Sequence, residues 1–467
     1  MSDQHPENNN TAAFAGLNLD AALLANLEML NFQTMTPVQA LALPEILQGR
    51  DLIAQARTGS GKTAAFGLGI LQRLNVKHFR VQALVLCPTR ELADQVARDI
   101  RQLGRQIHNI KVLTLCGGVP FGPQKGSLEH GAHIVVGTPG RIEEHLRKGN
   151  LSLQHLTQFV LDEADRMLDM GFGDVIEQIR GYLPAQRQTL LFSATYPENI
   201  RQLASKLLKQ PVSVEAPELH DDTSIRERYI EINSQADRSD ALIWLLQQYQ
   251  PTSALVFCNT RQSTEEVASK LSAAGFSALP IHGDLEQRDR DVRLVKFTNH
   301  SITVLVATDV AARGLDIEAL DLVVNYHLPN DPEVHTHRIG RTGRAGQRGI
   351  ACSLFHSGER HKTELLASMS ERQPEQSTAG SPDTQQRGAP PAMITLQIDG
   401  GKKHKLRPGD IVGALTGEGG IDGTMIGKIS TFDTSTYVAV ERNIAGQAVT
   451  RLNDRKIKGR KFRARKV

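Results

Sequence analysis

The chain has 467 residues, of which 40% are hydrophobic, so it is long enough for two or three domains with their own cores. It contains no run of about 18 apolar residues, and its first ten residues lack the apolar segment of a signal peptide, so we expect neither a transmembrane helix nor secretion. The formal net charge of +3 decides little. However, residues 393–467 hold 15 Lys and Arg against 7 Asp and Glu, a net charge of +8, and the remainder has a net charge of −5. A basic segment on a mildly acidic body is typical of polyanion binding, although a solubilising surface would look the same.

The four cysteines are far apart in the sequence and form no CxxC pair. Neither a zinc site nor a disulfide framework is expected from this spacing. The simplest interpretation is a set of buried, reduced thiols in a cytoplasmic protein. The cysteines are Cys87, Cys116, Cys258 and Cys352.

The first twelve residues are polar, and we expect them to be disordered. Residues 13–213 alternate short apolar runs, which we predict to be strands, with helical patterns such as ELADQVARDIRQLGRQ. The runs contain few polar residues, as expected for strands that are covered on both faces. Repeated strand–helix–strand units predict an α/β domain with a mostly parallel sheet. The predicted strands are DLIAQA, ALVLCPT, KVLTLC, HIVVGTP, FVLDE and TLLFSAT.

The same pattern restarts after a pause at QPVSVEAPELHDDTS and predicts a second α/β domain over residues 214–370. Residues 371–391 are rich in Pro, Gln, Ser and Gly and have no apolar period, so we expect a flexible linker. Residues 392–467 then show the order β-α-β-β-α-β, which predicts a small α+β domain of the RRM type.

The stretch ARTGSGKT, residues 56–63, lies between a predicted strand and a predicted helix. This is the context of a phosphate-binding loop, in which glycines let backbone amides approach phosphates and the helix N-terminus adds positive charge. Lys62 would reach the β- and γ-phosphates, and the Thr63 hydroxyl would hold Mg²⁺. The alternative is a glycine-rich turn that binds nothing. The candidate loop residues are Thr58, Gly59, Ser60, Gly61, Lys62 and Thr63.

The stretch FVLDEADRML, which begins at residue 159, ends a buried strand in three carboxylates about 100 residues after this loop. We expect Asp162 to hold Mg²⁺, largely through water, and Glu163 to orient and polarise the attacking water. The alternative is an acidic N-cap of the following helix, which stays open for Asp165.

Taken together and in order, the motifs AxTGSGKT, PTREL, GG, TPGR, DEAD, SAT, HGDLEQRDR, ATDVAARGLD and HRIGRTGR resemble those of the DEAD-box family of ATP-dependent RNA helicases. The resemblance covers residues 14 to about 358. It implies two tandem RecA-like domains, with ATP and Mg²⁺ as cofactors and RNA as partner.

The resemblance also implies roles in nucleotide binding. In NFQTMTPVQ, residues 31–39, Gln39 would read the adenine edge with Thr36 beside it, although Asn31 and Met35 depart from the family pattern. The upstream Phe14 would stack on the base, and Asp316 would contact the ribose. Arg341 and Arg344, placed on a predicted helix, would neutralise charge on the γ-phosphoryl group, whereas Arg338 is expected to be structural.

For RNA, the resemblance implies contacts to the sugar-phosphate backbone with little reading of bases. Ser193 and Thr195 would link ATP hydrolysis to strand separation, with Asp165 as their hydrogen-bond partner. The candidate RNA-contacting residues of the two core domains are Thr89, Arg90, Gly117, Gly118, Thr138, Arg141, Gln287, Arg290, Thr308 and Asp309.

The C-terminal domain has a poor platform for stacking bases, since its first strand lacks an aromatic residue and its third offers only Tyr437. Two basic clusters take the place of aromatic residues, which predicts recognition of a folded RNA by shape and phosphates. GGKKHKLRPGD, ALTGEGGIDG and KIKGR resemble the RNA-binding domain of one bacterial branch of the family, which implies a 23S ribosomal RNA hairpin as anchor and pre-50S particles as the setting. The alternative is general polyanion affinity. The candidate contacts are Lys402, Lys403, Lys405, Arg407, Lys456, Lys458 and Arg460.

The sequence therefore predicts an RNA-stimulated ATPase that separates short RNA duplexes locally in large-subunit assembly, and a monomer by default. Its rivals are an ATP-gated RNA clamp or annealing factor, a DNA helicase and an inactive scaffold. The clamp would need the same motifs, so sequence does not separate it from a helicase.

Overall fold

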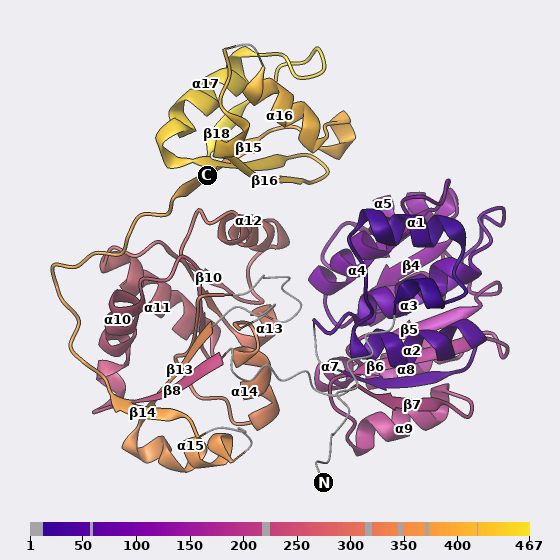
Figure 1. The fold of residues 1–467 in the computed structure, drawn as a ribbon, viewed down its shortest axis with the longest axis horizontal. Helices are drawn as coiled ribbons and strands as arrows, with labels where there is room; N and C mark the ends of the chain where they lie inside the picture. Colours follow the sequence, from indigo (N-terminus) through magenta and orange to yellow (C-terminus); the bar gives the residue numbers. More distant parts are fainter. Residues whose placement is uncertain are drawn as a thin grey trace, which may run out of the picture. The chain divides into compact units, whose positions relative to one another are not determined.

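The computed structural model describes residues 13–56, 59–216, 225–312, 320–343, 349–368, 373–417 and 419–467 (Figure 1). The chain divides into two compact units. The first contains the N-terminal domain, and the second contains the two domains that follow. The last strand of the first sheet extends to Glu215, two residues beyond the predicted boundary at 213, and the first strand of the second sheet begins at Ile225.

The first domain is built on a parallel sheet, as the alternating strand and helix patterns predict. Its strand order is β3-β4-β2-β5-β6-β1-β7. Because parallel strands all run in the same direction, their carboxyl ends lie at one edge of the sheet. The strands are β1 (Leu52–Gln55), β2 (Ala83–Leu86), β3 (Val112–Leu115), β4 (Ile134–Gly137), β5 (Gln158–Leu161), β6 (Gln188–Ser193) and β7 (Val212–Glu215).

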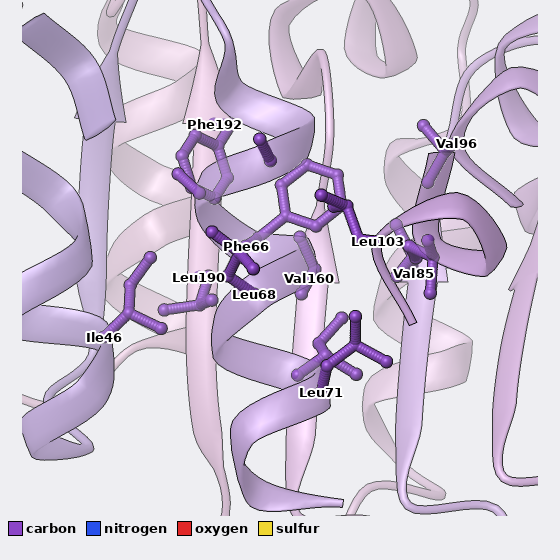
Figure 2. Packing of buried hydrophobic residues seen from close by; sticks show 14 of the residues in the cluster. Ile46, Phe66, Leu68, Leu71, Val85, Val96, Leu103, Val160, Leu190 and Phe192 are labelled. Carbon is purple, nitrogen blue, oxygen red and sulfur yellow. The ribbon is translucent and has the colours of Figure 1, made fainter. Parts of the chain in front are cut away.

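Helices cover both faces of this sheet. Successive side chains of a strand point to opposite faces, so each strand contributes to two apolar cores. Ala83 and Val85 of β2 belong to one apolar core, and Leu84 and Leu86 belong to the other. In the first core the rings of Phe66 and Phe192 lie 5.3 Å apart (Figure 2). On that face lie α1 (Ala21–Met29), α2 (Pro37–Gln48), α3 (Lys62–Arg73) and α4 (Arg90–Leu103), and against the other core pack α6 (Pro139–Arg147), α7 (Ala164–Asp169), α8 (Gly173–Arg180) and α9 (Glu198–Leu207). Helix α5 (Phe121–Glu129) connects β3 and β4.

The second domain repeats this design with the strand order β10-β11-β9-β12-β13-β8-β14. Its strands are β8 (Ile225–Ile232), β9 (Ala254–Phe257), β10 (Ala278–Ile281), β11 (Val304–Ala307), β12 (Leu322–Asn325), β13 (Gly349–His356) and β14 (Glu375–Thr378). Its helices are α10 (Arg238–Tyr249), α11 (Arg261–Ala273), α12 (Gln287–Thr298), α13 (Asp309–Ala312), α14 (Pro332–Ile339) and α15 (Arg360–Ala367).

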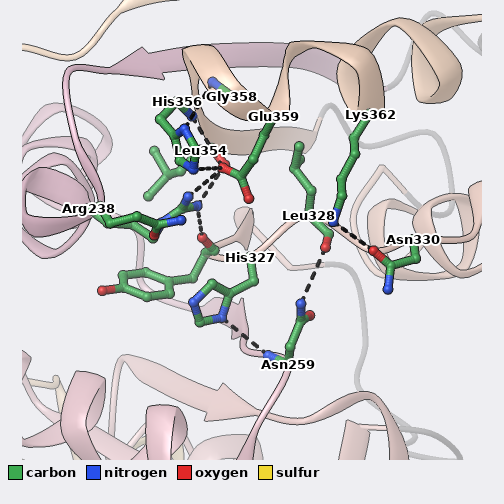
Figure 3. A network of polar contacts seen from close by, with 12 residues as sticks. Arg238, Asn259, His327, Leu328, Asn330, Leu354, His356, Gly358, Glu359 and Lys362 are labelled. Carbon is green, nitrogen blue, oxygen red and sulfur yellow. Dashed lines mark hydrogen bonds and ion pairs between the residues drawn. The ribbon is translucent and has the colours of Figure 1, made fainter.

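A buried arginine ties the ends of two strands of this second sheet to the segment that follows β13. Arg238, only 1% exposed, donates to the Leu354 carbonyl at 2.9 Å and to the Glu359 carboxylate at 2.6 Å (Figure 3). It also donates to the Tyr326 carbonyl at 2.5 Å. A buried guanidinium is stable only when its N–H groups have partners. The three contacts of Arg238 therefore hold the ends of β12 and β13 in place.

The segment expected to be a flexible linker is instead held along the second domain over its described part, residues 373–391. Strand β14 pairs in parallel with β8. Gln247 of α10 donates to the carbonyls of Asp383 and Gln386 at 2.8 and 2.9 Å and accepts from the Asp383 amide at 2.9 Å. The composition of this segment did not indicate these contacts. They are hydrogen bonds to backbone groups, which require no periodic pattern of apolar residues.

The C-terminal domain has the predicted β-α-β-β-α-β order and an antiparallel sheet, β16-β17-β15-β18. Its core packs Leu396 and Val438 against Ile411 and Leu452 of the two helices. The single candidate aromatic, Tyr437, is 2% exposed, which leaves it no free face for a base. The elements are β15 (Met393–Ile398), α16 (Pro408–Thr416), β16 (Ile426–Thr431), β17 (Thr436–Glu441), α17 (Ala445–Asp454) and β18 (Ala464–Lys466).

All four cysteines are buried and none forms a disulfide, as their spacing predicts. Burial raises the pKa of the Cys258 and Cys352 thiols to about 12, so neither is ionised near neutral pH. In the described part of the chain, each helix is too short or too polar to cross a lipid bilayer.

The contacts of Gln247 predict a local stability effect. Gln247→Ala removes three hydrogen bonds to residues 383–386, each worth about 1 kcal/mol. We expect the opening free energy of amides in residues 375–386, measured by native-state hydrogen exchange, to fall by about 3 kcal/mol. Gln248→Ala, an exposed neighbour on the same helix, should leave these amides unchanged. Equal exchange in the two variants would contradict this assignment.

Candidate nucleotide and RNA site

The phosphate loop lies between β1 and α3 and is fastened to the Gln39 motif. Gly61 has a φ of +95°, a conformation that favours glycine, and a Cβ there would lie 2.4 Å from Gln39 Nε2. Gln39 Nε2 donates to the Gly61 carbonyl at 3.1 Å, and the Thr36 amide donates to Gln39 Oε1 at 2.9 Å. The loop and this motif are therefore one structural unit. Thr58 lies outside the described residues.

Lys62 begins α3 and is buried. Its Nζ donates to the Ala56 carbonyl at 2.9 Å, which holds the ammonium group across the loop. The neighbouring Thr63 stays partly exposed at the N-terminus of the helix, where the first amides lack helical partners. This arrangement is suited to binding a phosphate.

Two carboxylates, Asp162 and Glu163, are buried at the carboxyl end of β5. Glu163 has a φ of +53°, a strained conformation for a residue other than glycine, of the kind that concentrates at functional sites. It forms an ion pair with Arg166 at 3.4 Å. Asp162 Oδ1 is buried without a hydrogen-bond partner. Burial raises the pKa of Asp162 to about 7, and Lys62 opposes this effect while the charge of Glu163 adds to it.

Asp165 is joined to the SAT motif, as the sequence predicts. Its Oδ2 accepts from the Ala194 and Thr195 amides, both at 3.0 Å, and from the Thr195 hydroxyl at 3.3 Å. The Asp165 amide donates to the Ser193 hydroxyl at 3.3 Å. The helix that follows β5 is therefore hydrogen-bonded directly to the end of β6 and the segment after it.

A cavity of about 300 Å³ joins these groups. Its lining includes Phe32, which is 37% exposed, whereas Phe14 is 3% exposed, belongs to the core and meets Phe32 edge-on with ring centroids 6.2 Å apart. The expectation that Phe14 stacks on a base is therefore corrected: Phe14 supports Phe32, the aromatic residue that faces the cavity. The position of Phe32 within the motif could have indicated this. The predicted residues that line the cavity are Gln39, Gly59, Gly61, Lys62, Thr63, Asp162 and Glu163.

The predicted RNA contacts of the first domain follow β2, β3 and β4, which are neighbours in the sheet and end at one edge. Gly118, with a φ of +69°, makes room for Arg90, since a Cβ would lie 2.3 Å from the Arg90 guanidinium. Arg90 Nη1 is buried without a hydrogen-bond partner. Thr89 caps α4 by accepting from the Leu92 amide at 3.3 Å.

On the same edge, Arg141 donates to the Val119 carbonyl at 3.1 Å and lies 5.5 Å from the centre of the Phe121 ring. It thus supports the loop that contains Gly117 and Gly118. Thr138 precedes α6 and is buried. The structure brings these residues together as the order of the motifs predicts, and their contact with RNA stays a prediction.

In the second domain, Asp309 has a structural partner that the sequence did not reveal. Its two carboxylate oxygens accept from Arg338 Nε and Nη2 at 2.6 and 2.7 Å. Arg338 is buried and also donates to Asn325 Oδ1 at 3.0 Å, which agrees with the structural role predicted for it. Asp309 is therefore better described as a positioning residue than as an RNA contact, because a carboxylate repels phosphate.

The remaining second-domain candidates are placed in part. Gln287 and Arg290 share the first turn of α12, where Arg290 donates to Gln287 Oε1 at 3.4 Å, and Thr308 follows β11. Arg341 is buried in the turn after α14, so the prediction that it lies on a helix is wrong. Helix α14 ends at Ile339, two residues before Arg341. Asp316 and Arg344 lie outside the described residues.

Two basic loops of the C-terminal domain, about fifty residues apart in sequence, lie side by side. Lys458 Nζ donates to the Lys405 carbonyl at 2.8 Å and pairs with Asp410 at 2.9 Å. Lys458 and Lys405 both have positive φ, which marks tight turns in the two loops. The seven predicted cationic contacts are all exposed: Lys402, Lys403, Lys405, Arg407, Lys456, Lys458 and Arg460.

The fold and the cavity define a nucleotide-binding protein with tandem α/β core domains and a basic appended domain. Three family profiles match it: DEAD/DEAH box helicase over residues 36–203, Helicase conserved C-terminal domain over 237–346 and DbpA RNA binding domain over 395–466. The chain therefore belongs to the DEAD-box family of ATP-dependent RNA helicases.

Among relatives, the chain is 51% identical to the ATP-dependent RNA helicase DbpA of Escherichia coli, over 97% of this chain and 99% of that protein. It is 45% identical to the DEAD-box ATP-dependent RNA helicase CshA of Geobacillus kaustophilus, over 73% of each chain. Among solved structures, S. cerevisiae Dbp5 bound to RNA and ADP BeF3 matches with a TM-score of 0.72 and 33% identity, over 78% of this chain and 95% of that chain. ATP-dependent RNA helicase activity follows for this chain.

The position of Glu163 beside Asp162 yields a kinetic prediction. Glu163→Gln keeps the shape of the side chain but removes the carboxylate expected to orient and polarise the attacking water, so kcat for RNA-stimulated ATP hydrolysis should fall by about 10² or more. Nucleotide affinity, measured by calorimetry, should change by less than about threefold. Glu129→Gln, an exposed position at the end of α5, serves as the control. Hydrolysis at the wild-type rate in Glu163→Gln would assign this role to another residue.

Proposed function

We propose that this helicase separates short RNA duplexes locally while its C-terminal domain is anchored to a hairpin of 23S ribosomal RNA, in the assembly of the large ribosomal subunit. The observation that carries the anchor is the pair of adjacent basic loops within the segment matched by the DbpA RNA binding domain. Their exposed cations are suited to phosphates of a folded RNA, and the buried Tyr437 argues against stacking of a single strand. The process takes place in the cytoplasm on pre-50S particles, with the chain as a monomer.

Mg²⁺ is the metal that the cavity fits. The described residues contain no group of three or more His, Cys, Asp and Glu side chains that could enclose an ion. A magnesium ion that keeps most of its water needs few protein ligands, and the buried Oδ1 of Asp162 supplies a negative oxygen of the preferred kind. Asp162, through water, and the Thr63 hydroxyl would hold the ion. When bound, Mg²⁺ neutralises charge on the phosphates of ATP.

The chain's own residues then divide the work of hydrolysis. Lys62 and the loop amides hold the phosphates, Phe32 stacks on the base, and Gln39 reads its edge. Glu163 orients the attacking water. Arg341 and Arg344 neutralise the γ-phosphoryl group when the two core domains close around ATP, and in other NTPases such arginines raise the rate by on the order of 10³ to 10⁵. Asp316 contacts the ribose.

RNA lies across the strand ends that carry Arg90, Gly118 and Thr308, and is held mainly through its phosphates. ATP-driven closure bends this strand, which separates a nearby short duplex. Hydrolysis restores the open state. An ATP-gated clamp or annealing factor would use the same residues. The rate of duplex separation distinguishes these two functions from a helicase.

The hydrogen bonds between Asp165 and the SAT segment predict how ATP hydrolysis is coupled to unwinding. Ser193→Ala with Thr195→Ala removes the two hydrogen bonds that the Ser193 and Thr195 hydroxyls form with Asp165. The hydrogen bonds from the Ala194 and Thr195 amides to the Asp165 carboxylate stay in place. We expect the number of duplexes separated per ATP to fall at least about tenfold, with kcat for hydrolysis within about threefold of wild type. Ser205→Ala, exposed on α9, is the control. Unchanged unwinding per ATP would remove this coupling role.

The anchor is tested by ATPase rates with poly(U), total ribosomal RNA and a 23S fragment that carries the peptidyl-transferase-centre hairpins. The 23S fragment should stimulate strongly, and Lys402→Ala with Lys456→Ala should raise its apparent Kd about tenfold, because each lost phosphate contact removes favourable ion release. Lys428→Ala, exposed on β16 outside both loops, is the control. Equal stimulation of the ATPase by all three RNAs would contradict the specific anchor and support general RNA affinity. ATP hydrolysis without duplex separation would favour the clamp.

A further inference from the structure

A group of polar side chains lies between the second sheet and helix α14. Glu227 of β8, Ser353 of β13 and Asn325 of β12 come from three neighbouring strands. Asn325 and Ser353 are fully buried, and His335 of α14 is 2% exposed. Polar groups buried in this way are stable only when they are hydrogen-bonded, so their partners determine how each side chain is oriented.

Arg338 determines the orientation of the Asn325 amide. Arg338 Nη1 donates to Asn325 Oδ1 at 3.0 Å. Because a guanidinium offers only donors, the oxygen of the amide must face Arg338, and the nitrogen must face the other way. Asn325 Nδ2 then has two acceptors, Ser353 Oγ at 3.0 Å and His335 Nδ1 at 3.3 Å. Both N–H groups of the amide are therefore used.

The Asn325 amide in turn determines which nitrogen of His335 carries the proton. Since Nδ1 accepts a hydrogen bond from Asn325, it has no proton, and the neutral ring is protonated on Nε2. Nε2 lies 2.6 Å from Glu227 Oε1. The Tyr229 ring, which is buried, packs edge-on against the imidazole with ring centroids 6.2 Å apart. His335 is thus a donor to a carboxylate at one end and an acceptor from an amide at the other.

Arg338 connects this group to the turn that contains Arg341. His335 precedes Arg338 by three residues on α14, so both side chains lie on one face of the helix. The Arg338 side chain forms two hydrogen bonds with Asp309. Its carbonyl accepts from the Arg341 amide at 3.2 Å, and the Arg341 carbonyl accepts from the Leu320 amide at 3.2 Å. The backbone of Arg341 is therefore held by the residue that Asn325 contacts.

We propose that His335 is a positioning residue for ATP hydrolysis. As a neutral imidazole protonated on Nε2, it holds the Asn325 amide in the orientation that binds Arg338. Arg338 in turn fixes the turn from which Arg341 reaches the γ-phosphoryl group. The inference rests on the function proposed above for Arg341. His335 acts on kcat rather than on ATP binding, because the phosphate loop belongs to the first domain.

The role of His335 is tested by the ATPase kinetics of full-length variants at saturating RNA. His335→Phe keeps a planar ring that neither accepts nor donates, so kcat should fall about tenfold or more while KM for ATP stays within about threefold. His335→Gln supplies both an acceptor and a donor and should bring kcat back to within about threefold of wild type. His361→Phe makes the same change at an exposed position of α15 and should leave both parameters unchanged.

Nitrogen-15 NMR of the histidine rings of the full-length wild-type protein tests the proton position directly. The His335 signals, identified by their absence in His335→Gln, should show a protonated Nε2 and an unprotonated Nδ1. A protonated Nδ1 would overturn the inference, even if His335→Phe does not fold. A wild-type kcat in His335→Phe would also overturn it, as would a loss of kcat in His335→Gln as large as the loss in His335→Phe.

Arg341→Ala separates this inference from the function on which it rests. A large loss of kcat in Arg341→Ala, together with a wild-type kcat in His335→Phe, would overturn the role of His335 alone. A wild-type kcat in Arg341→Ala would instead overturn the proposed role of Arg341, and the role of His335 with it.

Discussion

Backbone pairing of β5 between β2 and β6 holds the acidic segment after β5 in the centre of the first domain. Because the strands are parallel, the same edge also carries the ends of β1, β2, β4 and β6, and with them the phosphate loop, Arg90, Thr138 and Ser193. The apolar cores on both faces keep this edge fixed, since the residues of β2, β4, β5 and β6 are all buried between them. The positions of the predicted site residues at this edge therefore depend on ladder hydrogen bonds made several residues away from them.

Several close approaches at this edge are possible only because a side chain is small or a carboxylate is suitably placed. The absence of a side chain at Gly61 leaves room for the Gln39 amide, and its absence at Gly118 leaves room for the Arg90 guanidinium. The Asp165 carboxylate accepts hydrogen bonds from two amides of the segment after β6, so two motifs thirty residues apart are joined directly. The predicted nucleotide and RNA contacts of the first domain thus lie at one edge of the same sheet.

The second domain uses buried arginines for a comparable purpose. Arg238 joins the ends of β12 and β13 to Glu359, and Arg338 joins Asp309 to Asn325. Breaking such a buried pair leaves an uncompensated charge, which is costly. These contacts set the geometry of the loops that carry the Thr308 and Arg341 motifs.

The sequence by itself determined the α/β class, the strand order along the chain, the phosphate loop, the carboxylates after β5 and the partnership of Asp165 with Thr195. Those features follow from local periodicity and from motif spacing, which are written along the chain. Only the tertiary structure decided that Phe32 rather than Phe14 faces the cavity, that Asp309 is occupied by Arg338, and that residues 373–391 are held on the second domain. It also brought Lys405 beside Lys458 and placed His335 between Glu227 and Asn325. Each of these depends on packing between segments far apart in sequence, where neither period nor composition carries a signal.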